Sequence, residues 1–546
     1  MSSYTFNTIP TIHKRRSFQD LSRVITTSMS VGTLYPIAVR EVVPGSTFKE
    51  VESHIARLTS SFRRPVMDNY YMDVWFFWTP SRILYDDFVC VFGENKKTAW
   101  SSVQEYQNPT YTTRQTVKSG TVADYLGMPL GLQPAGITSL PFRGFAEIYN
   151  EWFRNENVID PMLVQKGSST VNEQLNSNPW SPANYTGLPP KIAKKKDYFT
   201  SALPAPQKGS PVPISTNMDV PLKTTDDYYE VGDLRLGMLD ALGDEKAYIL
   251  TSYDSLNNPS DNGIVEVYDG GNLSTSGVVN ATNLVASTSL LSSTNVNDLR
   301  LAFQTQRMLE LDARAGTRYR EYLLAHYGVS NSDARMQIPE YLGGKRCPLD
   351  TYQVAQTSSS TTSDKLGSLG AFGYGQGRSG YIKSFSEHGY VYCVAAIRYN
   401  HTYQQGLNKM WSRLKRNDYY DPLFAYLGEQ PIWTSEIFAS SQQSFKDNIF
   451  GYQEAWADYR YSPSMITGQA RSDADNSLDV YHFADDYTNA PTLSQQFIEE
   501  TPVYFDRTVD VASSAQDNFI VQFYFKSSGW LPMPVRSNPG LIDHTY

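Results

Sequence analysis

The sequence predicts a mainly β protein whose strands fit a double-sheet jelly roll with a few helices inserted in long loops. Two features favour this class. Short segments rich in Tyr, Val, Trp and Phe end at Pro or Gly, as buried strands do, and very long stretches without helical period separate them, which suits a jelly roll. A propeller is disfavoured, because no internal repeat of about 40–50 residues occurs.

The composition narrows the functional classes. The chain has 546 residues, 13% aromatic and 19% charged, and Tyr is the commonest aromatic residue with 38 copies. Low charge and many aromatics argue against intrinsic disorder and against a coiled coil. The formal net charge of −9 excludes a globally basic nucleic-acid binder, although a local basic patch is compatible with it.

Targeting and redox signals are sparse. No stretch approaches the roughly 18 apolar residues of a membrane helix, and no apolar core follows the charges near the N-terminus, so no signal peptide is expected. The three cysteines, Cys90, Cys347 and Cys393, lack CxxC spacing. We therefore expect a reducing compartment and unpaired thiols, with Cys90 and Cys393 inside apolar patterns.

In chain order, the first predicted part is a polar N-terminal arm, residues 1–30, whose one charge cluster runs from His13 to Arg16. Strand and helix signals then begin, bounded by Pro and Gly. They predict strands at Leu34–Val43 and Met67–Thr79 and a short helix at Ser81–Phe92.

Four further helices are predicted, the first and last from apolar stripes at helical spacing and the middle two from an Asn-Asp start and from Gly316 and Gly328 at their ends. They are Phe142–Arg154, Asn297–Ala315, Thr317–Tyr327 and Gln405–Lys415. Trp152 lies on the stripe of the first helix and Trp411 on that of the last, so both are candidate core or interface anchors.

The segments between these helices differ in composition. Pro179–Val220 is rich in Pro and Lys and should be extended or loop, whereas Thr251–Thr294 has turn signals and few large apolar residues and should be a small β-rich surface insertion. Gln356–Gly380 is predicted to be a loop. Later strands are predicted at Gly389–Tyr399, Val503–Val511 and Asn518–Ser527.

No motif supports catalysis or a cofactor. Gly375–Gly380 matches GxGxxG, but a dinucleotide site needs a strand before it and a helix after it, so a flexible loop is expected. An EF-hand starting at Asp473 fails because Leu478 and Ala484 stand where Gly and Glu are needed. Since Walker A, HExxH and GxSxG sequences are also absent, we expect no enzyme activity, no cofactor and no metal site.

Two basic clusters are candidates for phosphate contact. The first comprises Lys14, Arg15 and Arg16, with Arg23 nearby, in the polar arm; the second comprises Lys191 and Lys194–Lys196. An ordinary solvated surface is the alternative for each. The arm cluster is the better candidate, and neighbouring aromatic residues could add stacking on single-stranded bases.

Several strings of residues are distinctive enough to indicate a family. In order along nearly the whole chain, they resemble the major capsid protein of the Microviridae, the small single-stranded DNA bacteriophages, and specifically of its gokushovirus branch. The matching segments are Pro65–Pro80, Asn150–Arg154, Asp197–Gly209, Asn297–Arg318, Pro339–Arg346, Thr402–Trp411, Phe450–Thr467 and Pro539–His544.

The resemblance implies an eight-stranded viral jelly-roll β-sandwich that assembles into a T=1 icosahedral shell of about sixty copies. The shell would enclose a circular single-stranded DNA genome, and one loop insertion would form three-fold protrusions for host attachment. On this basis residues 226–296 are the inserted surface protrusion, residues 31–225 the first part of the jelly roll, and residues 297–546 its second part with helical insertions and C-terminal strands.

The resemblance also implies partners and a location. The partners are further copies of the chain, the genome, a small basic DNA-binding virion protein, a pilot protein, an internal scaffolding protein and a host cell-surface receptor. The location is the virion, assembled in the bacterial host cytoplasm. One alternative is a glycan- or receptor-binding β-sandwich such as a phage spike, because Tyr-rich sandwiches stack on sugars; less favoured is a glycosidase, which would need two positioned carboxylates.

Overall fold

The computed structural model describes most of the chain, and the described residues form two compact units. The units are Met1–Lys208 with Glu310–Tyr546, and Gly209–Leu309. The described residues are 15–96, 106–111, 114–134, 136–168, 180–182, 184–212, 222–224, 235–239, 245–251, 266–269, 272–273, 280–281, 284–286, 296–357, 366–440, 445–446 and 448–536.

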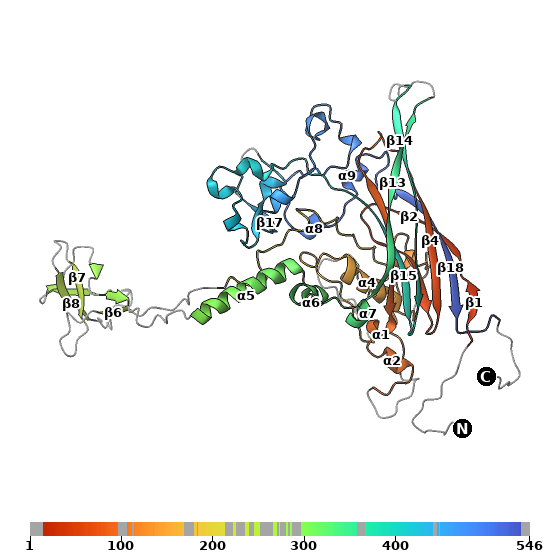
Figure 1. Ribbon diagram of the computed structural model, residues 1–546, viewed down its shortest axis with the longest axis horizontal. Coiled ribbons are helices and arrows are strands. Elements are labelled where there is room, and N and C mark those ends of the chain that lie inside the picture. Colours follow the sequence, from red (N-terminus) through yellow and green to blue (C-terminus); the bar gives the residue numbers. More distant parts are fainter. Residues whose placement is uncertain are drawn as a thin grey trace, which may run out of the picture. The chain divides into compact units, whose positions relative to one another are not determined.

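The first unit is built on a nine-stranded antiparallel sheet in the order β1-β18-β4-β14-β13-β5-β15-β3, with β2 also paired to β18 (Figure 1). The strands are β1 Ser17–Asp20, β2 Arg23–Met29, β3 Tyr35–Val42, β4 Thr47–Leu58, β5 Tyr70–Pro80, β13 Glu340–Ala355, β14 Leu369–Ser384, β15 Gly389–Tyr399 and β18 Phe519–Leu531. The predicted mainly β jelly-roll class is confirmed.

Alternation along the strands shows how the sheet curls around one core. Phe523 in β18 and Val74 in β5 are both fully buried and belong to the same apolar cluster, although their strands lie in opposite halves of the strand order. Because side chains alternate between the two faces of a strand, the same faces of both halves must look inward. The result is a sandwich with an aromatic and aliphatic interior.

Helical segments cover the outer face of β5 and β15. The helix α4 (Leu140–Ile148) continues into one π-helical turn, η2 (Tyr149–Phe153), and its side chains share a second apolar cluster with Phe77 of β5 and Tyr392 of β15. The predicted helix Phe142–Arg154 is therefore confirmed, with a wider last turn. Where one helix was predicted at Ser81–Phe92, two short ones form, α1 (Ser81–Leu84) and α2 (Phe88–Val91).

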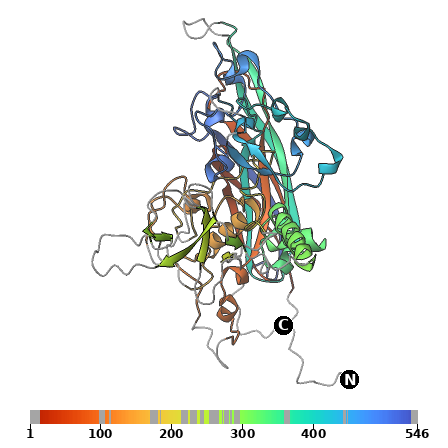
Figure 2. The ribbon, with the colours of Figure 1, turned by 90° about the vertical axis from the view of Figure 1, so that its left-hand side faces the viewer.

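The β13–β14 hairpin rises beyond its neighbours (Figure 1, Figure 2). Residues Glu340–Leu349 of β13 pair with β5, whereas Asp350–Ala355 extend beyond β5 and pair with β14.

A third apolar cluster, which includes Phe199, Tyr403 and Phe497, fills the loop region of the first unit. The remaining elements of this unit are α3 Val122–Tyr125, α6 Tyr319–Tyr327, α7 Asp333–Met336, α8 Gln495–Ile498, α9 Val503–Asp506, β16 Gln430–Trp433, β17 Ile449–Gln453 and the 3-10 turns η5 Lys409–Ser412, η6 Arg416–Asp418, η7 Pro422–Phe424, η8 Thr434–Glu436, η9 Ala457–Arg460, η10 Gly468–Ala470 and η11 Asp479–Tyr481.

The second unit contains short antiparallel strands. Five of them form one sheet in the order β10-β9-β8-β7-β11, and β12 pairs with β6. A helix, α5 (Val296–Ala315), starts in this unit and ends in the first; it confirms the helix predicted at Asn297–Ala315. The strands are β6 Leu222–Thr224, β7 Arg235–Leu239, β8 Glu245–Thr251, β9 Glu266–Asp269, β10 Asn272–Leu273, β11 Asn280–Ala281 and β12 Leu284–Ala286.

Three sequence predictions need correction. The helix predicted at Gln405–Lys415 is only the turn η5, because the backbone on its N-terminal side bonds to a neighbouring loop: Leu407 donates to the Ser435 carbonyl at 2.9 Å. The strand predicted at Val503–Val511 begins instead as the helix α9. The loop predicted at Gln356–Gly380 is in large part the strand β14, GxGxxG included.

The N-terminal arm, predicted as residues 1–30, is also corrected. From Ser17 onward the chain belongs to the sheet, since β1 and β2 both pair with β18. In β2, every second residue from Arg23 to Met29 is partly or fully buried. This alternation is expected of a strand that turns one face to the core. Residues 1–14 lie outside the described part of the chain.

Candidate functional site

The structure does not gather the predicted arm cluster into one patch. Arg15 and Arg16 are exposed, and Arg16 donates to the Thr47 hydroxyl at the start of β4 at 3.1 Å; Lys14 lies outside the described residues. Arg23 instead lines an open groove of about 490 Å³ between β2 and β3, with its guanidinium 5.7 Å from the ring centre of Phe525. Burial, together with the positive charge of Arg40, lowers the pKa of Arg23.

The second basic cluster is also divided. Lys194 is 5% exposed, and its Nζ lies 3.1 Å from the Asp485 carboxylate. Lys191 donates to the Thr33 hydroxyl at 2.8 Å. Only Lys195 and Lys196 of this cluster are exposed, so the four lysines do not form the phosphate-binding surface that their spacing suggested.

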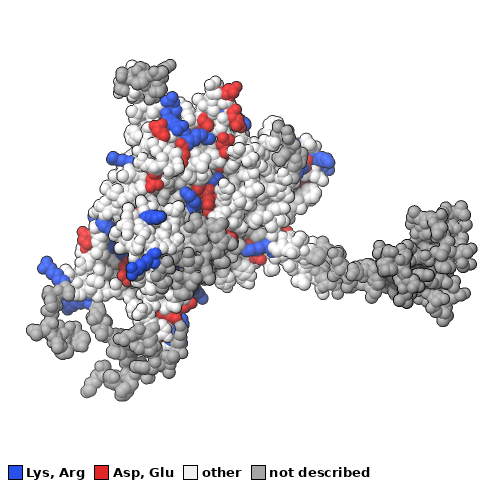
Figure 3. Space-filling view, turned by 180° about the vertical axis from the view of Figure 1, so that it is seen from behind, with Lys and Arg blue, Asp and Glu red and all other residues white. Residues whose placement is uncertain are grey.

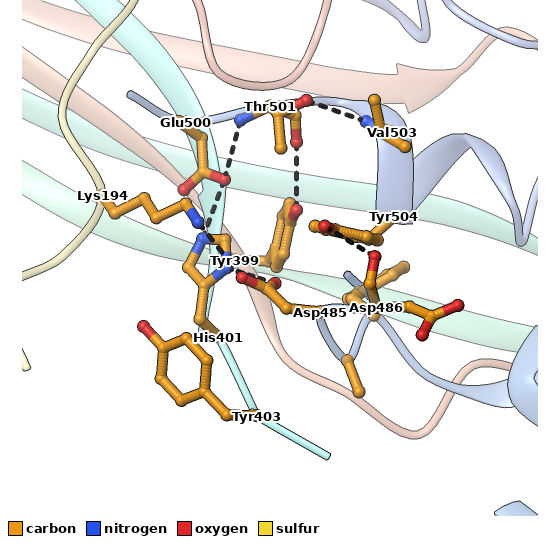
Figure 4. A network of polar contacts seen from close by, with 12 residues as sticks. Lys194, Tyr399, His401, Tyr403, Asp485, Asp486, Glu500, Thr501, Val503 and Tyr504 are labelled. Atoms are coloured by element: carbon orange, nitrogen blue, oxygen red, sulfur yellow. Dashed lines mark hydrogen bonds and ion pairs between the residues drawn. The ribbon is translucent and has the colours of Figure 1, made fainter. Parts of the chain in front are cut away.

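Lys194 leads into a buried network of ionisable side chains (Figure 4). The two ring nitrogens of His401 bond to two different carboxylates, Nδ1 to Asp485 at 2.7 Å and Nε2 to Glu500 at 2.9 Å. The side chains of all three residues are at most 1% exposed. Two buried carboxylates thus face two cations, His401 and Lys194.

Opposite charges in this network stabilise one another, as the pKa values of His401 and Asp485 show. Burial opposes the positive charge of His401 and by itself lowers its pKa, but Asp485 and Glu500 outweigh burial and raise this pKa to about 9. Burial also opposes the charge on Asp485, yet His401 and Lys194 hold its pKa below the usual range. The network therefore joins parts of the chain that are far apart in the sequence, at Lys194, at His401 and at residues 485–500, and it has the character of a structural clamp.

Trp152, the first predicted anchor, lies partly buried at the edge of the second apolar cluster. Its Nε1 donates to the Pro339 carbonyl at 2.9 Å, and its ring centre lies 5.4 Å from that of Phe77. The Arg320 guanidinium covers the ring at 4.4 Å. Trp152 thus joins the helical layer to the sheet within the subunit.

Trp411, the second predicted anchor, is not a core residue, because it is 66% exposed. It belongs to a stretch of apolar residues without cover from the described part of the chain, which we call the 407–427 surface. Its exposed members are Leu407, Met410, Trp411, Leu414, Tyr419, Tyr420, Leu423, Phe424, Tyr426 and Leu427.

The three thiols are free, as predicted for Cys90, Cys347 and Cys393. All three are buried, which was predicted for Cys90 and Cys393 but not for Cys347. In the residues that the structure describes, no group of three His, Cys, Asp or Glu side chains could hold a metal ion. No described helix is long and apolar enough to cross a membrane.

Comparisons with known proteins identify the family. Residues 7–541 match the family described as "Capsid protein (F protein)". The chain is 35% identical to "Capsid protein VP1" of Bdellovibrio phage phiMH2K, covering 97% of this chain and 96% of that protein. It is 36% identical to "Capsid protein VP1" of Spiroplasma virus 4, covering 94% and 93%, and 33% identical to that of Chlamydia phage 1, covering 98% and 97%.

These matches confirm the resemblance to Microviridae capsid proteins and support a structural role in the virion rather than an enzymatic one. Sequence reasoning missed the clamp of Lys194, His401, Asp485 and Glu500, since no spacing rule joins residues that only the fold brings together. Alignment over nearly the full length leaves one conclusion: the chain belongs to the phage capsid protein (F protein) family and is a major capsid protein.

Proposed function

We propose that copies of this chain close into a T=1 icosahedral shell of about sixty subunits around a circular single-stranded DNA genome. The observation that carries the assembly role is the 407–427 surface. Leu414 is 86% exposed, Leu423 88% and Tyr426 fully exposed. A run of exposed large apolar side chains of this kind is typical of a protein interface, and in a capsid protein the partner is another copy.

The 407–427 surface is held in position by polar contacts at its base. The Trp456 Nε1 donates to the Phe424 carbonyl at 2.8 Å, and Arg413 is ion-paired with Asp458. Burying one leucine side chain contributes about 1.5–3 kcal/mol. Several such residues on a preorganised surface are enough to drive association, even after the entropy of ordering is subtracted.

The test is to change Leu423 and Tyr426 together to serine and measure native mass by light scattering, with electron microscopy of the product. We expect folded subunits that no longer form shells. The matched control is Met67→Ser, since Met67 is 84% exposed but lies outside the 407–427 surface, and it should assemble normally. Normal shells from the double variant would refute the assignment of this surface.

The insertion is proposed to be the host-facing protrusion, residues 226–296, clustered at the three-fold axes. Its support is that, among the described residues, the strands of this segment pair with one another or with β6 and not with the nine-stranded sheet. Loops on a rigid scaffold commonly carry recognition, and three adjacent copies would strengthen a weak receptor contact by avidity. Replacing Gly232–Thr294 by a short Gly/Ser linker should leave particles that no longer adsorb to host cells; normal adsorption would exclude the receptor role.

The finer partners are proposed from the family. They are the genome, a small basic DNA-binding protein, a pilot protein and an internal scaffolding protein, with assembly in the bacterial cytoplasm. The arm residues Lys14, Arg15 and Arg16 are proposed to face the genome. Arg23, predicted with them, pairs with the inward-facing Phe525 and is partly buried, so it is left out of this role. Neutralising Lys14, Arg15 and Arg16 should lower DNA content more than shell yield, and a variant that also neutralises Arg23 shows whether this cation affects folding.

A further inference from the structure

The outward faces of β18, β4 and β14 form one continuous surface without an acidic residue. We call it the outer strand face. Its acids are excluded by alternation: Glu50 and Glu52 of β4 point inward and are buried. The members are Ile520, Gln522, Tyr524, Lys526, Ser528 and Trp530 of β18, Thr47, Lys49, Val51, Ser53, Ile55 and Arg57 of β4, and Tyr374, Gln376, Arg378, Gly380, Ile382 and Ser384 of β14.

Four cations stand on the outer strand face, and none of them has an ion-pair partner among the described residues. They are Lys49, Arg57, Arg378 and Lys526, all exposed. Two acids point to the same side at its borders, Asp20 on β1 opposite Ser528 and Asp350 on β13 opposite Tyr374. Hydrogen bonds from Ser22 and, more weakly, the charge of Lys526 lower the pKa of Asp20. In a chain of net charge −9, this surface is locally positive. Charges of both signs are scattered over the side of the molecule seen in Figure 3.

Strand register places aromatic rings between these cations. Arg57 pairs with Tyr374 on one side and Ile520 on the other, and its guanidinium lies 5.9 Å from the Tyr374 ring centre. Tyr524 stands opposite Ser53, whose other neighbour is Arg378. At about 3.4 Å per residue, the face extends for about 34 Å along β18 from Ile520 to Trp530.

The arm meets this surface at its far end. Trp530 pairs with Thr47, and the Thr47 hydroxyl accepts a hydrogen bond from Arg16 at 3.1 Å. Phe18 of β1 packs edge-on against Trp530, with ring centres 5.7 Å apart. Arg16 therefore adds a fifth cation, and Phe18 a further ring, at the end where the chain leaves β1 toward its N-terminus.

No described helix or loop covers these strands on their outward side; the helices of the first unit lie on the other side of the sheet (Figure 1). We propose that the outer strand face binds single-stranded nucleic acid, the genome of the shell, with the cations on phosphates and the rings stacked on bases. This inference rests on the proposed enclosure of a single-stranded genome. It assigns the contact to the sheet itself in addition to the arm.

The chemistry favours a single strand over other occupants. A duplex offers phosphates but hides the base faces on which Tyr524, Trp530 and Tyr374 could stack, whereas rings at the sheet surface beside cations suit unpaired bases. A second basic protein would be repelled by the positive charge. The complementary charge is that of the phosphate backbone, whose neutralisation releases counterions and makes binding depend on salt.

The test compares two variants of the full chain that remove the same charge. The first changes Lys49, Arg57, Arg378 and Lys526 to Gln; the control changes the four exposed cations Lys118, Lys195, Lys196 and Arg335, which lie outside these strands. Dissociated subunits are titrated against a fluorescent oligo-dT and the matching duplex at several salt concentrations. Thermal melting confirms that both variants are folded.

For the parent we expect tighter binding to oligo-dT than to the duplex. Each phosphate contact contributes about 0.7 to the slope of log affinity against log salt for a single strand, so the face variant should lose about 2–3 units of slope and the control almost none. Tyr524→Ala with Tyr374→Ala should weaken binding at least about 10-fold while the slope is unchanged, as expected for lost stacking.

Three results would overturn the proposal. One is a parent subunit that does not bind oligo-dT at low salt; another is an equal loss in the face and control variants, which would indicate unspecific attraction. The third is a face variant that binds DNA normally but cannot assemble, which would make this surface a contact between copies. Shell formation and native mass are measured separately, so a failure of the T=1 assembly proposal is distinguishable from a failure of this one.

Discussion

The first prediction concerns the balance of charge in the buried clamp of Lys194, His401, Asp485 and Glu500. Changing His401 to Gln removes the cation that lies between Asp485 and Glu500 and leaves Lys194 as the remaining cation for two carboxylates, both without solvent access. Breaking a buried ionic contact in this way costs about 3–5 kcal/mol, because one charge stays in the interior without compensation.

The pH dependence gives an independent estimate of the same interaction. The pKa of His401 is raised from 6.5 to about 9, and a difference of this size corresponds to about 3 kcal/mol. Because the folded-state pKa is the higher one, this stabilisation is present in full below about pH 6.5 and is lost as the pH rises through about 9. The parent should therefore lose about 3 kcal/mol across that window, and His401→Gln should lack this loss.

The assay is urea unfolding of dissociated subunits, followed by tryptophan fluorescence between about pH 6 and pH 9. The measured quantity is the difference between the parent and His401→Gln, because thiols and tyrosines of the unfolded chain begin to ionise toward the upper end in both proteins. A second variant, His401→Gln with Glu500→Gln, removes the unpaired carboxylate and restores balance between Lys194 and Asp485. It should recover at least about 2 kcal/mol relative to the single variant. A parent whose stability does not change over this pH window, or a double variant no more stable than the single one, would refute the electrostatic account.

Three further predictions concern single side chains. Trp411→Ala should change subunit stability by less than about 0.5 kcal/mol, since the ring is 66% exposed, yet lower the yield of shells measured by sedimentation; normal yield would remove Trp411 from the interface. Trp152→Ala should cost about 2–3 kcal/mol in urea, less than a fully buried tryptophan, and Trp152→Phe about 1 kcal/mol for the lost bond to Pro339; equal losses would contradict the ring packing. Burial raises the pKa of the Cys347 and Cys393 thiols, so these and Cys90 should resist alkylation in native subunits and react in urea by mass spectrometry, and a linked cysteine peptide would contradict the free thiols.

How well the sequence predicted each strand depended on what its side chains face. β5 was evident because both of its faces are covered, so Val74–Trp78 reads as an uninterrupted apolar run. β4 was missed because its inward positions include Glu50, Glu52 and His54, which the interior satisfies with partners such as Arg40 and Ser379. Local patterns cannot show such partners, since they come from other strands.

Glycine concealed β14 in a similar way. A side chain at Gly375 would meet Leu349 at 2.3 Å, and one at Gly377 would meet Cys347 at 2.2 Å. These alternate positions are glycine because neighbouring side chains occupy the space, and the resulting composition resembles a loop. The candidate sites show the same limit: the exposure of Trp411 and the acid-free outer strand face depend on which face of an element is covered.

The position of β18 in the sheet has a consequence for how the subunit is made. This strand, Phe519–Leu531, pairs with β4 on one side and with β1 and β2 on the other, and the Ser28–Asp517 hydrogen bond closes a loop of 489 residues. At about 5–20 residues per second, a ribosome needs about 25–100 s to synthesise that interval. The N-terminal strands must wait for their partner throughout, so closure of this half of the sandwich is post-translational, and contacts of such long range make it slow. A nascent chain stalled before Phe519 would expose the edges of β2 and β4 and should be prone to aggregation and proteolysis.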